Sequence, residues 1–240
     1  MGCAHNIAAE TIRIAVASNF AAPIKAITKV FKEKTGHKVI LAFGSTGKHY
    51  AQITHGAPFD IFLAADKERP LLLERSGLIV DNSRFTYARG SLILWAPERS
   101  FESLDAAIRN ISSNDFVAIA NPKLSPYGLA AKQVLQEVGL WLPLQAKLVR
   151  GENIAQTFQF VSTGNANVGF IAGSQLPENL LRQANTFWSL PPSLYSPIDQ
   201  QAVLLKTSKL KALKVAQEFL TFLKSTEGKK IIQKHGYRFP

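Results

Sequence analysis

Apolar residues along the chain alternate between short runs typical of buried strands and stretches with a helical period. Residues 12–17, 38–43 and 59–65 are apolar runs that predict strands, and a helical pattern follows each of the first two. The first helical pattern ends at Gly36 and the second begins near Gly47. This order predicts an α/β fold with a mostly parallel sheet, whose ligand site lies outside the carboxyl ends of the strands.

The same alternation restarts in the second half of the chain. Apolar runs at 116–120 and 168–172 predict strands, and helical patterns start near Gly128 and near Ile154. Two further helical patterns close the chain. No internal sequence repeat is visible, but the two halves have a similar order of elements, so we expect two lobes of similar architecture.

Two long β-rich stretches, at 85–97 and 200–206, mark where the chain passes between the halves. A length of 240 residues with 46% hydrophobic content is sufficient for two cores. We therefore predict a discontinuous first lobe (residues 11–88 and 198–240) and a second lobe (residues 89–197), joined by a two-stranded hinge.

The formal net charge of +11 is compatible with three kinds of partner: nucleic acid, a membrane surface or an anionic small ligand. The lysines are spread along the chain, without an arginine-rich run or an aromatic and basic cluster. We therefore expect no nucleic-acid partner, and solvated helix faces explain most of the charge.

The chain contains a single cysteine, Cys3, so it has neither a disulfide framework nor a cysteine metal cluster. The alternatives for Cys3 are a lipid-anchoring site next to Gly2 and a free cysteine in a disordered tail. No apolar run approaches the roughly 20 residues that span a bilayer. The first ten residues lack the basic and then apolar layout of a signal peptide, so export would require a leader that has been removed.

Four segments combine small, hydroxyl or amide residues with the start of a helical pattern. They are Ser18-Asn19, Ser45-Thr46-Gly47, Pro126-Tyr127-Gly128 and Asn153-Ile154. The first N–H groups of a helix have no partner within it, and the helix dipole adds an effective charge of about +0.5 there. Four such starts sum to roughly +2 without a basic side chain. The segments therefore predict a site for one small oxyanion, although each serine taken alone is more simply explained as a helix cap.

Other polar residues are weaker candidates. Asp60 and Asp66 have the character of an acid and base pair, but we expect them to hold neighbouring backbone amides. His49 and His55 are six residues apart and lack a metal-ligand partner at suitable spacing, so we expect two surface histidines. Lys48 is expected to be exposed in the first turn of its helix. The chain contains no nucleophile elbow, phosphate-binding Walker loop, dinucleotide fingerprint or zinc motif.

The four segments lie within longer motifs that resemble the ModA-type molybdate-binding proteins, the extracytoplasmic solute receptors of molybdate ABC importers. The resemblance runs from about Thr11 to Tyr237 and is carried by VASNFAAPIKAI, FGSTGKHYAQITHGAPFDIFLAAD, NPKLSPYGLAAKQVL, RGENIAQTFQFVSTGNANVGFIAGSQ and KKIIQKHGY. It implies a periplasmic-binding-protein fold of type 2. It also implies ligand contacts from five residues: Ser18, Asn19, Ser45, the N–H of Tyr127 and the N–H of Ile154.

One position departs from some members of this family. Those members use a tyrosine hydroxyl from the segment that reads GFIAGSQ here, where the corresponding residue is Ala172. The branch with Asn19 and Tyr127 also lacks that hydroxyl, so the resemblance implies that binding is retained. We expect Gly173-Ser174 to contribute to the interface between the lobes.

The resemblance further implies a monomeric, non-enzymatic receptor in the periplasm or another extracytoplasmic compartment. Its ligand would be molybdate or tungstate, with no cofactor and with molybdenum present only in the bound oxyanion, held by the same five residues. Its macromolecular partner would be the membrane ABC permease of the molybdate importer.

Three alternatives remain. A receptor for sulfate or phosphate would use the same fold, although phosphate requires an acceptor for its proton and only Glu152 lies near the four segments. An enzyme on this fold would need a nucleophile and base pair or a cofactor lysine, and we identify neither. The effector module of a transcription regulator would need an attached helix-turn-helix.

Overall fold

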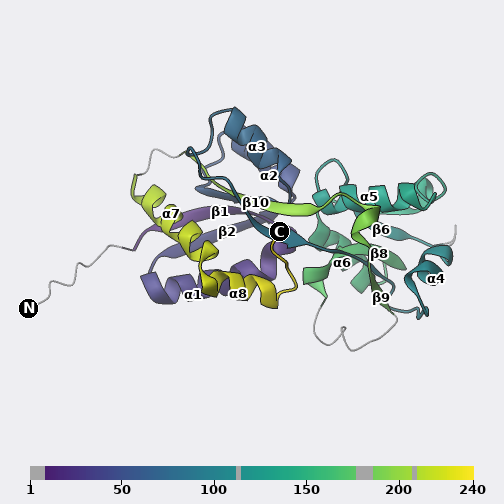
Figure 1. Cartoon of the computed structure of the whole chain (residues 1–240). Coiled ribbons are helices and arrows are strands. Elements are labelled where there is room, and N and C mark those ends of the chain that lie inside the picture. Colours follow the sequence, from purple (N-terminus) through teal and green to yellow (C-terminus); the bar gives the residue numbers. More distant parts are fainter. Residues whose placement is uncertain (1–8, 112–114, 177–185, 207–209) are drawn as a thin grey trace, which may run out of the picture.

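The computed structural model describes residues 9–111, 115–176, 186–206 and 210–240, which form two lobes side by side (Figure 1). Each lobe contains a five-stranded sheet. The first sheet has the spatial order β2 (Lys38–Gly44), β1 (Thr11–Ala17), β3 (Ile61–Leu63), β10 (Ile198–Leu204) and β4 (Phe85–Gly90). The second has the order β7 (Leu148–Gly151), β6 (Val117–Ala120), β8 (Val168–Ala172), β5 (Leu92–Trp95) and β9 (Phe187–Ser189).

The two sheets have the same topology, as the similar order of elements in the two halves predicted. In each, one strand pairs in parallel with both of its neighbours, β1 in the first sheet and β6 in the second. The remaining pairs, those of β10 and β5, are antiparallel. In each sheet four of the five strands therefore run in the same direction and one, β10 or β5, runs against them, so the sheets are mixed but mostly parallel, as predicted. The reversed strand in each sheet is the one by which the chain enters from the other lobe.

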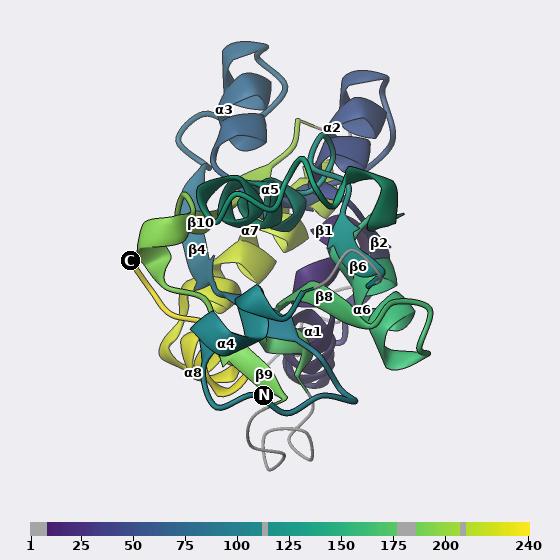
Figure 2. The same ribbon diagram turned by 90° about the vertical axis from the view of Figure 1, so that its right-hand side faces the viewer.

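Helices cover both faces of each sheet, and the two views in Figures 1 and 2 show this layering. The first lobe carries α1 (Ala21–Thr35), α2 (Thr46–Thr54), α3 (Glu68–Arg75), α7 (Leu210–Lys224) and α8 (Thr226–Lys234). The second carries α4 (Leu104–Arg109), α5 (Pro126–Glu137) and α6 (Ile154–Ser162). A 3-10 turn at Ser18–Phe20 leads directly into α1, and Gly36, with a φ of 73°, follows the last residue of that helix.

The side chains of β1 alternate between two cores, as expected for a strand that is buried on both faces. Ile14 and Val16 pack in the core that also contains Phe219 of α7. Ala15 lies in a smaller core with Ile53 of α2. The apolar run at 12–17 thus corresponds to doubly covered positions, whereas the run at 38–43 forms the edge strand β2, in which Ile40 and Phe43 are exposed.

The chain passes from the first sheet to the second between β4 and β5, with only Ser91 separating the two strands, and it returns along β10. Gly90, the last residue of β4, lies against the second lobe. A Cβ atom at this position would lie 2.1 Å from the hydroxyl of Tyr127, so only glycine fits.

Most predicted elements are present, with shifts of no more than three residues at their ends. The predicted strand at 59–65 is shorter and covers only Ile61–Leu63. Within the described part of the chain, the short elements α3, α4, β7 and β9 were not predicted. Cys3 lies outside the described residues. Within the described ranges, no helix has the length and apolar character needed to cross a membrane.

Candidate functional site

The four predicted helix starts all follow carboxyl ends of strands that are paired in parallel. The turn at Ser18 follows β1, α2 follows β2, α5 comes after β6 and α6 comes after β7. This placement is the one predicted from the sequence, since ligands of open α/β sheets bind at that edge.

Direct hydrogen bonds join these helix starts across the two lobes. The hydroxyl of Ser18 donates to Asn153 Oδ1 at 3.1 Å and accepts from the N–H of Ala155 at 3.4 Å, which joins the first start to that of α6. The N–H of Gly47 donates to the carbonyl of Leu124 at 2.8 Å, which joins α2 to the loop before α5. The lobes therefore contact each other at the site in a closed arrangement.

A buried amide completes the connection between the four starts. Gln200 on β10 is 0% exposed. Its Oε1 accepts from Asn19 Nδ2 at 2.9 Å and lies 3.0 Å from the hydroxyl of Tyr87, and its Nε2 donates to the hydroxyl of Tyr127 at 3.1 Å. One side chain thus links the Ser18 turn of the first lobe to α5 of the second.

The hydroxyls of three tyrosines around Gln200 remain protonated because they are buried. Burial raises the pKa of Tyr237 to about 12, and it raises the pKa values of Tyr87 and Tyr127 well above the usual phenol range. These groups are neutral hydrogen-bonding partners at any physiological pH. The network therefore places no negative charge beside the site.

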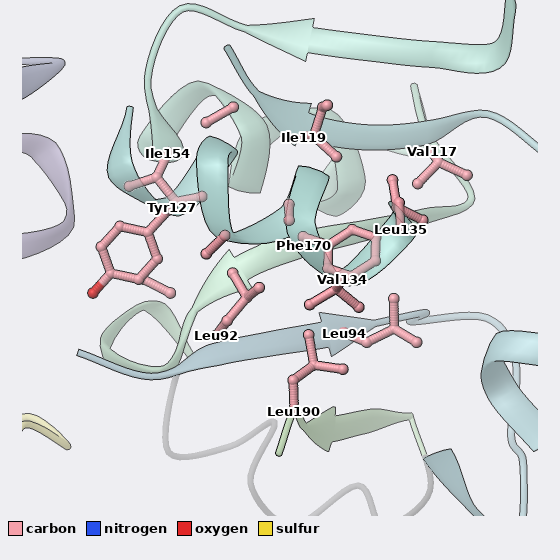
Figure 3. Packing of buried hydrophobic residues seen from close by; sticks show 14 of the residues in the cluster. Leu92, Leu94, Val117, Ile119, Tyr127, Val134, Leu135, Ile154, Phe170 and Leu190 are labelled. Atoms are coloured by element: carbon pink, nitrogen blue, oxygen red, sulfur yellow. The ribbon is translucent and has the colours of Figure 1, made fainter. Parts of the chain in front are cut away.

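In α5, one N–H of the first turn is left without a partner inside the helix. The first residue, Pro126, has no N–H, and the hydroxyl of Ser125 accepts from the N–H of Gly128 at 3.4 Å. The N–H of Tyr127 lies between these two. The hydroxyl of Tyr127 points away from the other labelled side chains of the second-lobe core (Figure 3). That hydroxyl accepts from Gln200 Nε2.

In the first turn of α6, the N–H of the first residue, Ile154, is likewise left without a partner inside the helix. Asn153 Oδ1 accepts from the second and third N–H groups, those of Ala155 at 3.0 Å and Gln156 at 3.1 Å. Tyr127 and Ile154 are the two positions at which the family resemblance implied backbone contacts. The capping residues of the two helices leave these donors free for a ligand.

Ser45 caps α2, as its simpler interpretation predicted. It is 3% exposed, and its hydroxyl oxygen accepts from the N–H of Lys48 at 3.4 Å. Accepting this bond leaves the hydroxyl hydrogen of Ser45 available to a ligand. Within the first turn of α2, Gly47 donates to the other lobe, which leaves the N–H of Thr46 as an additional donor.

Ser18 and Asn19 take different roles from those of a simple cap. The hydroxyl of Ser18 bonds to Asn153 and Ala155 of the second lobe. The side-chain amide of Asn19 donates to Gln200 and, at 2.8 Å, to Tyr237, so both of its hydrogens are used inside the first lobe. A contact from Asn19 to a ligand would therefore come from its backbone N–H at the start of the turn.

The segment after β8 contributes to the interface between the lobes, as expected. The hydroxyl of Ser174 donates to the carbonyl of Asn19 at 3.0 Å, and Tyr237 Oη lies 3.0 Å from the same hydroxyl. Ala172 presents no polar side-chain atom, and the hydroxyl of Ser174 is used in the contact between the lobes.

The other polar candidates are structural. Asp60 accepts from the N–H of Arg13 at 2.7 Å, and Asp66 accepts from the N–H of Arg69 at 3.1 Å, which confirms that both carboxylates hold backbone amides. Lys48 is exposed, as expected, and pairs across the lobes with Glu152 at 2.7 Å.

The prediction of two surface histidines was half wrong. His55 is exposed, but His49 is only 3% exposed, packed edge-on to Phe59 and Phe62. Burial lowers the pKa of His49, whose Nε2 lies 3.2 Å from the carbonyl of Val16. Among the described residues, no group of three or more His, Cys, Asp or Glu side chains could hold a metal ion.

Comparison with known proteins assigns the chain to a family. A model described as bacterial extracellular solute-binding protein matches residues 12–238. The chain is 45% identical over 237 residues to the molybdate-binding protein ModA of Rhodobacter capsulatus, covering 99% of this chain and 92% of that protein. The ModA of Azotobacter vinelandii is also 45% identical, over 229 residues that cover 95% of this chain and 90% of that protein. The chain belongs to the ModA-type molybdate-binding proteins.

Membership of the ModA-type family also agrees with the fold. The structure of the periplasmic molybdate-binding protein of Azotobacter vinelandii superimposes with a TM-score of 0.88 at 34% identity, covering 95% of this chain and 99% of that chain. The two-lobed α/β periplasmic-binding-protein fold is therefore confirmed. Proteins of this family are solute receptors, so the chain is a binding protein and not an enzyme.

The sequence interpretation missed the residues that support the four helix starts. Gln200, Tyr87 and Tyr237 connect the starts but carry no local motif. One signal was present: the sequence QQAVLLK places two amides at the beginning of an otherwise apolar strand. A buried polar side chain in such a strand needs partners, which here come from distant segments.

Replacing Gln200 with leucine should lower the free energy of unfolding by about 2–4 kcal/mol. Tyr127 and Asn19 would each lose a buried partner, at about 1–3 kcal/mol for a group left unpaired. Gln133→Leu is the matched control, because its hydrogen bonds to Ser196 lie at the exposed surface. Urea unfolding measures both variants, and equal losses would contradict the role assigned to Gln200.

Proposed function

We propose that this protein binds molybdate, or tungstate, between its two lobes and delivers it to a membrane ABC permease. The observation that carries the proposal is the set of neutral donors at four helix starts, which cross-lobe hydrogen bonds bring together. The lobes would be residues 11–88 with 198–240, and residues 89–197. The curated relatives named as molybdate-binding proteins support the choice of ligand.

The proposed ligand contacts are five: the hydroxyls of Ser18 and Ser45 and the backbone N–H groups of Asn19, Tyr127 and Ile154. All five residues are at least nine-tenths buried. Four helix starts supply an effective charge of roughly +2, which matches a dianion without the desolvation of a buried lysine or arginine. Molybdenum is held only within the oxyanion, so no metal ligand and no cofactor is required.

Selection among tetrahedral anions would depend on size and on protonation. Sulfate carries the same charge as molybdate but is smaller, so it would not reach all the donors at once. Monohydrogen phosphate needs an acceptor for its proton, and Glu152 is instead paired with Lys48 at the surface. These features favour molybdate over the sulfate and phosphate alternatives.

The family description as extracellular solute-binding proteins supports an extracytoplasmic location. Lipid anchoring through Cys3, a monomeric state and the absence of a nucleic-acid partner remain parts of this proposal. The positive net charge of +11 fits a receptor that attracts anions from solution.

Molybdate and tungstate should raise the melting temperature, whereas sulfate at the same concentration should not. A ligand that binds only the folded state stabilises it by about 2.7 kcal/mol at 100 times its dissociation constant. For a chain of this size that corresponds to about 5–10 °C. A thermal-shift series across the three sodium salts tests this, and a shift by sulfate equal to that by molybdate would rule out the proposed ligand.

Replacing Ile154 with proline should remove one ligand donor and leave the helix start intact. Proline suits the first position of a helix, and Asn153 before it has the extended ψ of 173° that proline prefers. Binding should weaken by about 1.5–3 kcal/mol, the range for a hydrogen bond to a charged group. Ile154→Ala is the matched control, because it loses the same buried side chain and keeps the N–H. If calorimetry shows equal affinities for the two variants, Ile154 does not donate to the ligand.

Ser45→Ala should weaken molybdate binding by about 1.5–3 kcal/mol and also lower stability by about 1 kcal/mol. The control is Ser225→Ala, because Ser225 caps α8 in the same way, accepting from Gly228 at 3.1 Å, but lies outside the site. The control should lose stability and keep its affinity. Calorimetry combined with thermal melts separates the two effects, and unchanged binding by Ser45→Ala would remove that hydroxyl from the site.

A further inference from the structure

The two lobes meet closely at Gly47, in the first turn of α2. Its N–H donates to the carbonyl of Leu124 in the second lobe at 2.8 Å. A Cβ atom at Gly47 would meet Leu124 Cα at 3.0 Å, Leu124 O at 3.1 Å and Leu124 Cδ2 at 3.3 Å. The three nearest atoms all belong to the opposite lobe, so the space for a side chain is limited by the lobe contact.

The backbone of Gly47 gives no other reason for glycine. Its φ is not among the positive values that favour glycine, such as that of Gly36. It is the second residue of α2, where alanine is compatible with the helix and reduces the conformational freedom of the unfolded chain. Glycine at this position therefore costs stability within the first lobe.

The loop that Gly47 contacts leads directly to the start of α5. The carbonyl of Lys123 accepts from Arg69 of the first lobe at 3.1 Å, and the next carbonyl, that of Leu124, accepts from Gly47. The hydroxyl that caps α5 belongs to the following residue, Ser125. The first lobe thus holds this loop by two consecutive carbonyls, four and three residues before the proposed donor Tyr127.

We propose that the contact between Gly47 and Leu124 is a closing contact that sets ligand affinity without touching the ligand. This inference rests on the proposed function, in which ligand is bound when the lobes close. The neighbouring pair Lys48 and Glu152 also crosses the lobes, but its side chains are 51% and 49% exposed, so it contributes little. The close approach of the Leu124 backbone to Gly47 restricts the residue type at position 47, whereas the exposed ion pair does not restrict the approach of the lobes.

The proposal gives Gly47→Ala effects of opposite sign on stability and binding. The melting temperature of the ligand-free protein should stay the same or rise by about 1–4 °C, because alanine favours the helix. Molybdate affinity should fall by about tenfold, because the added methyl group prevents full approach of Leu124 and weakens the hydrogen bond that Gly47 donates. A destabilised first lobe could not produce this combination.

The experiment compares the full-length parent, Gly47→Ala and Thr54→Ala. Thr54 is exposed at the other end of α2, so its replacement raises helix propensity without altering the lobe interface. Calorimetry with sodium molybdate gives the affinities, thermal melts without ligand give the stabilities, and small-angle scattering with saturating molybdate gives the radius of gyration. Gly47→Ala should bind molybdate more weakly than the parent, whereas Thr54→Ala should bind it equally well. The radius of gyration of Gly47→Ala with saturating molybdate should equal or exceed that of the parent.

Three outcomes overturn the inference. Unchanged or tighter binding by Gly47→Ala would show that the contact does not limit closure. Weaker binding together with a lower ligand-free melting temperature would show ordinary damage to the fold. If the parent itself fails to bind molybdate, the proposed function is wrong, and the closing contact loses its basis with it.

Discussion

The buried amide of Gln200 sets the geometry on which the rest of the site depends. A polar side chain that is fully buried must find its hydrogen-bond partners within the protein, and here the partners belong to both lobes. Asn19 and Tyr127 can satisfy the amide only if the Ser18 turn and α5 keep their relative positions. Since β10 is also the strand by which the chain returns from the second lobe, the same residue connects the hinge to the site.

The net charge of the protein and the donors of the proposed site act on an anion at different distances. The surface carries the net charge of +11, which attracts anions from solution and is screened by salt over about 10 Å. The proposed site would use neutral hydroxyls and N–H groups, beside tyrosines that stay protonated because they are buried. A buried cation would need a counterion whenever the ligand leaves, whereas neutral donors can return to water or to each other. The structure shows the second case, because the hydroxyl of Ser18 donates to the side-chain amide oxygen of Asn153.

The parts of the structure that were predictable from sequence depend on local patterns. Strands such as β1 follow from apolar runs, and the helix starts at Ser45 and Asn153 follow from residues that cap helices. The network around Gln200 was not predictable, because Asn19 bonds to residues 181 and 218 positions away. The burial of His49 was missed for a related reason: the aromatic rings that enclose it come from the loop before β3 and from β3 itself, outside its own helix. The side-chain amide of Asn19 could be assigned to the protein or to a ligand only once these partners were known.

The polar contacts between the lobes are individually weak, which suits a receptor that must also release its ligand. An exposed ion pair such as Lys48 and Glu152 contributes about 0–1 kcal/mol, and a single neutral hydrogen bond about 0.5–1.5 kcal/mol. A micromolar ligand binds with a free energy of about −8 kcal/mol, which is larger than the contribution of any single one of these contacts. In the proposed function this ligand takes donors from both lobes, so its binding stabilises the closed form. A glycine at position 47 fits this balance, because it allows the lobes to approach fully without adding an apolar contact that would hold them shut.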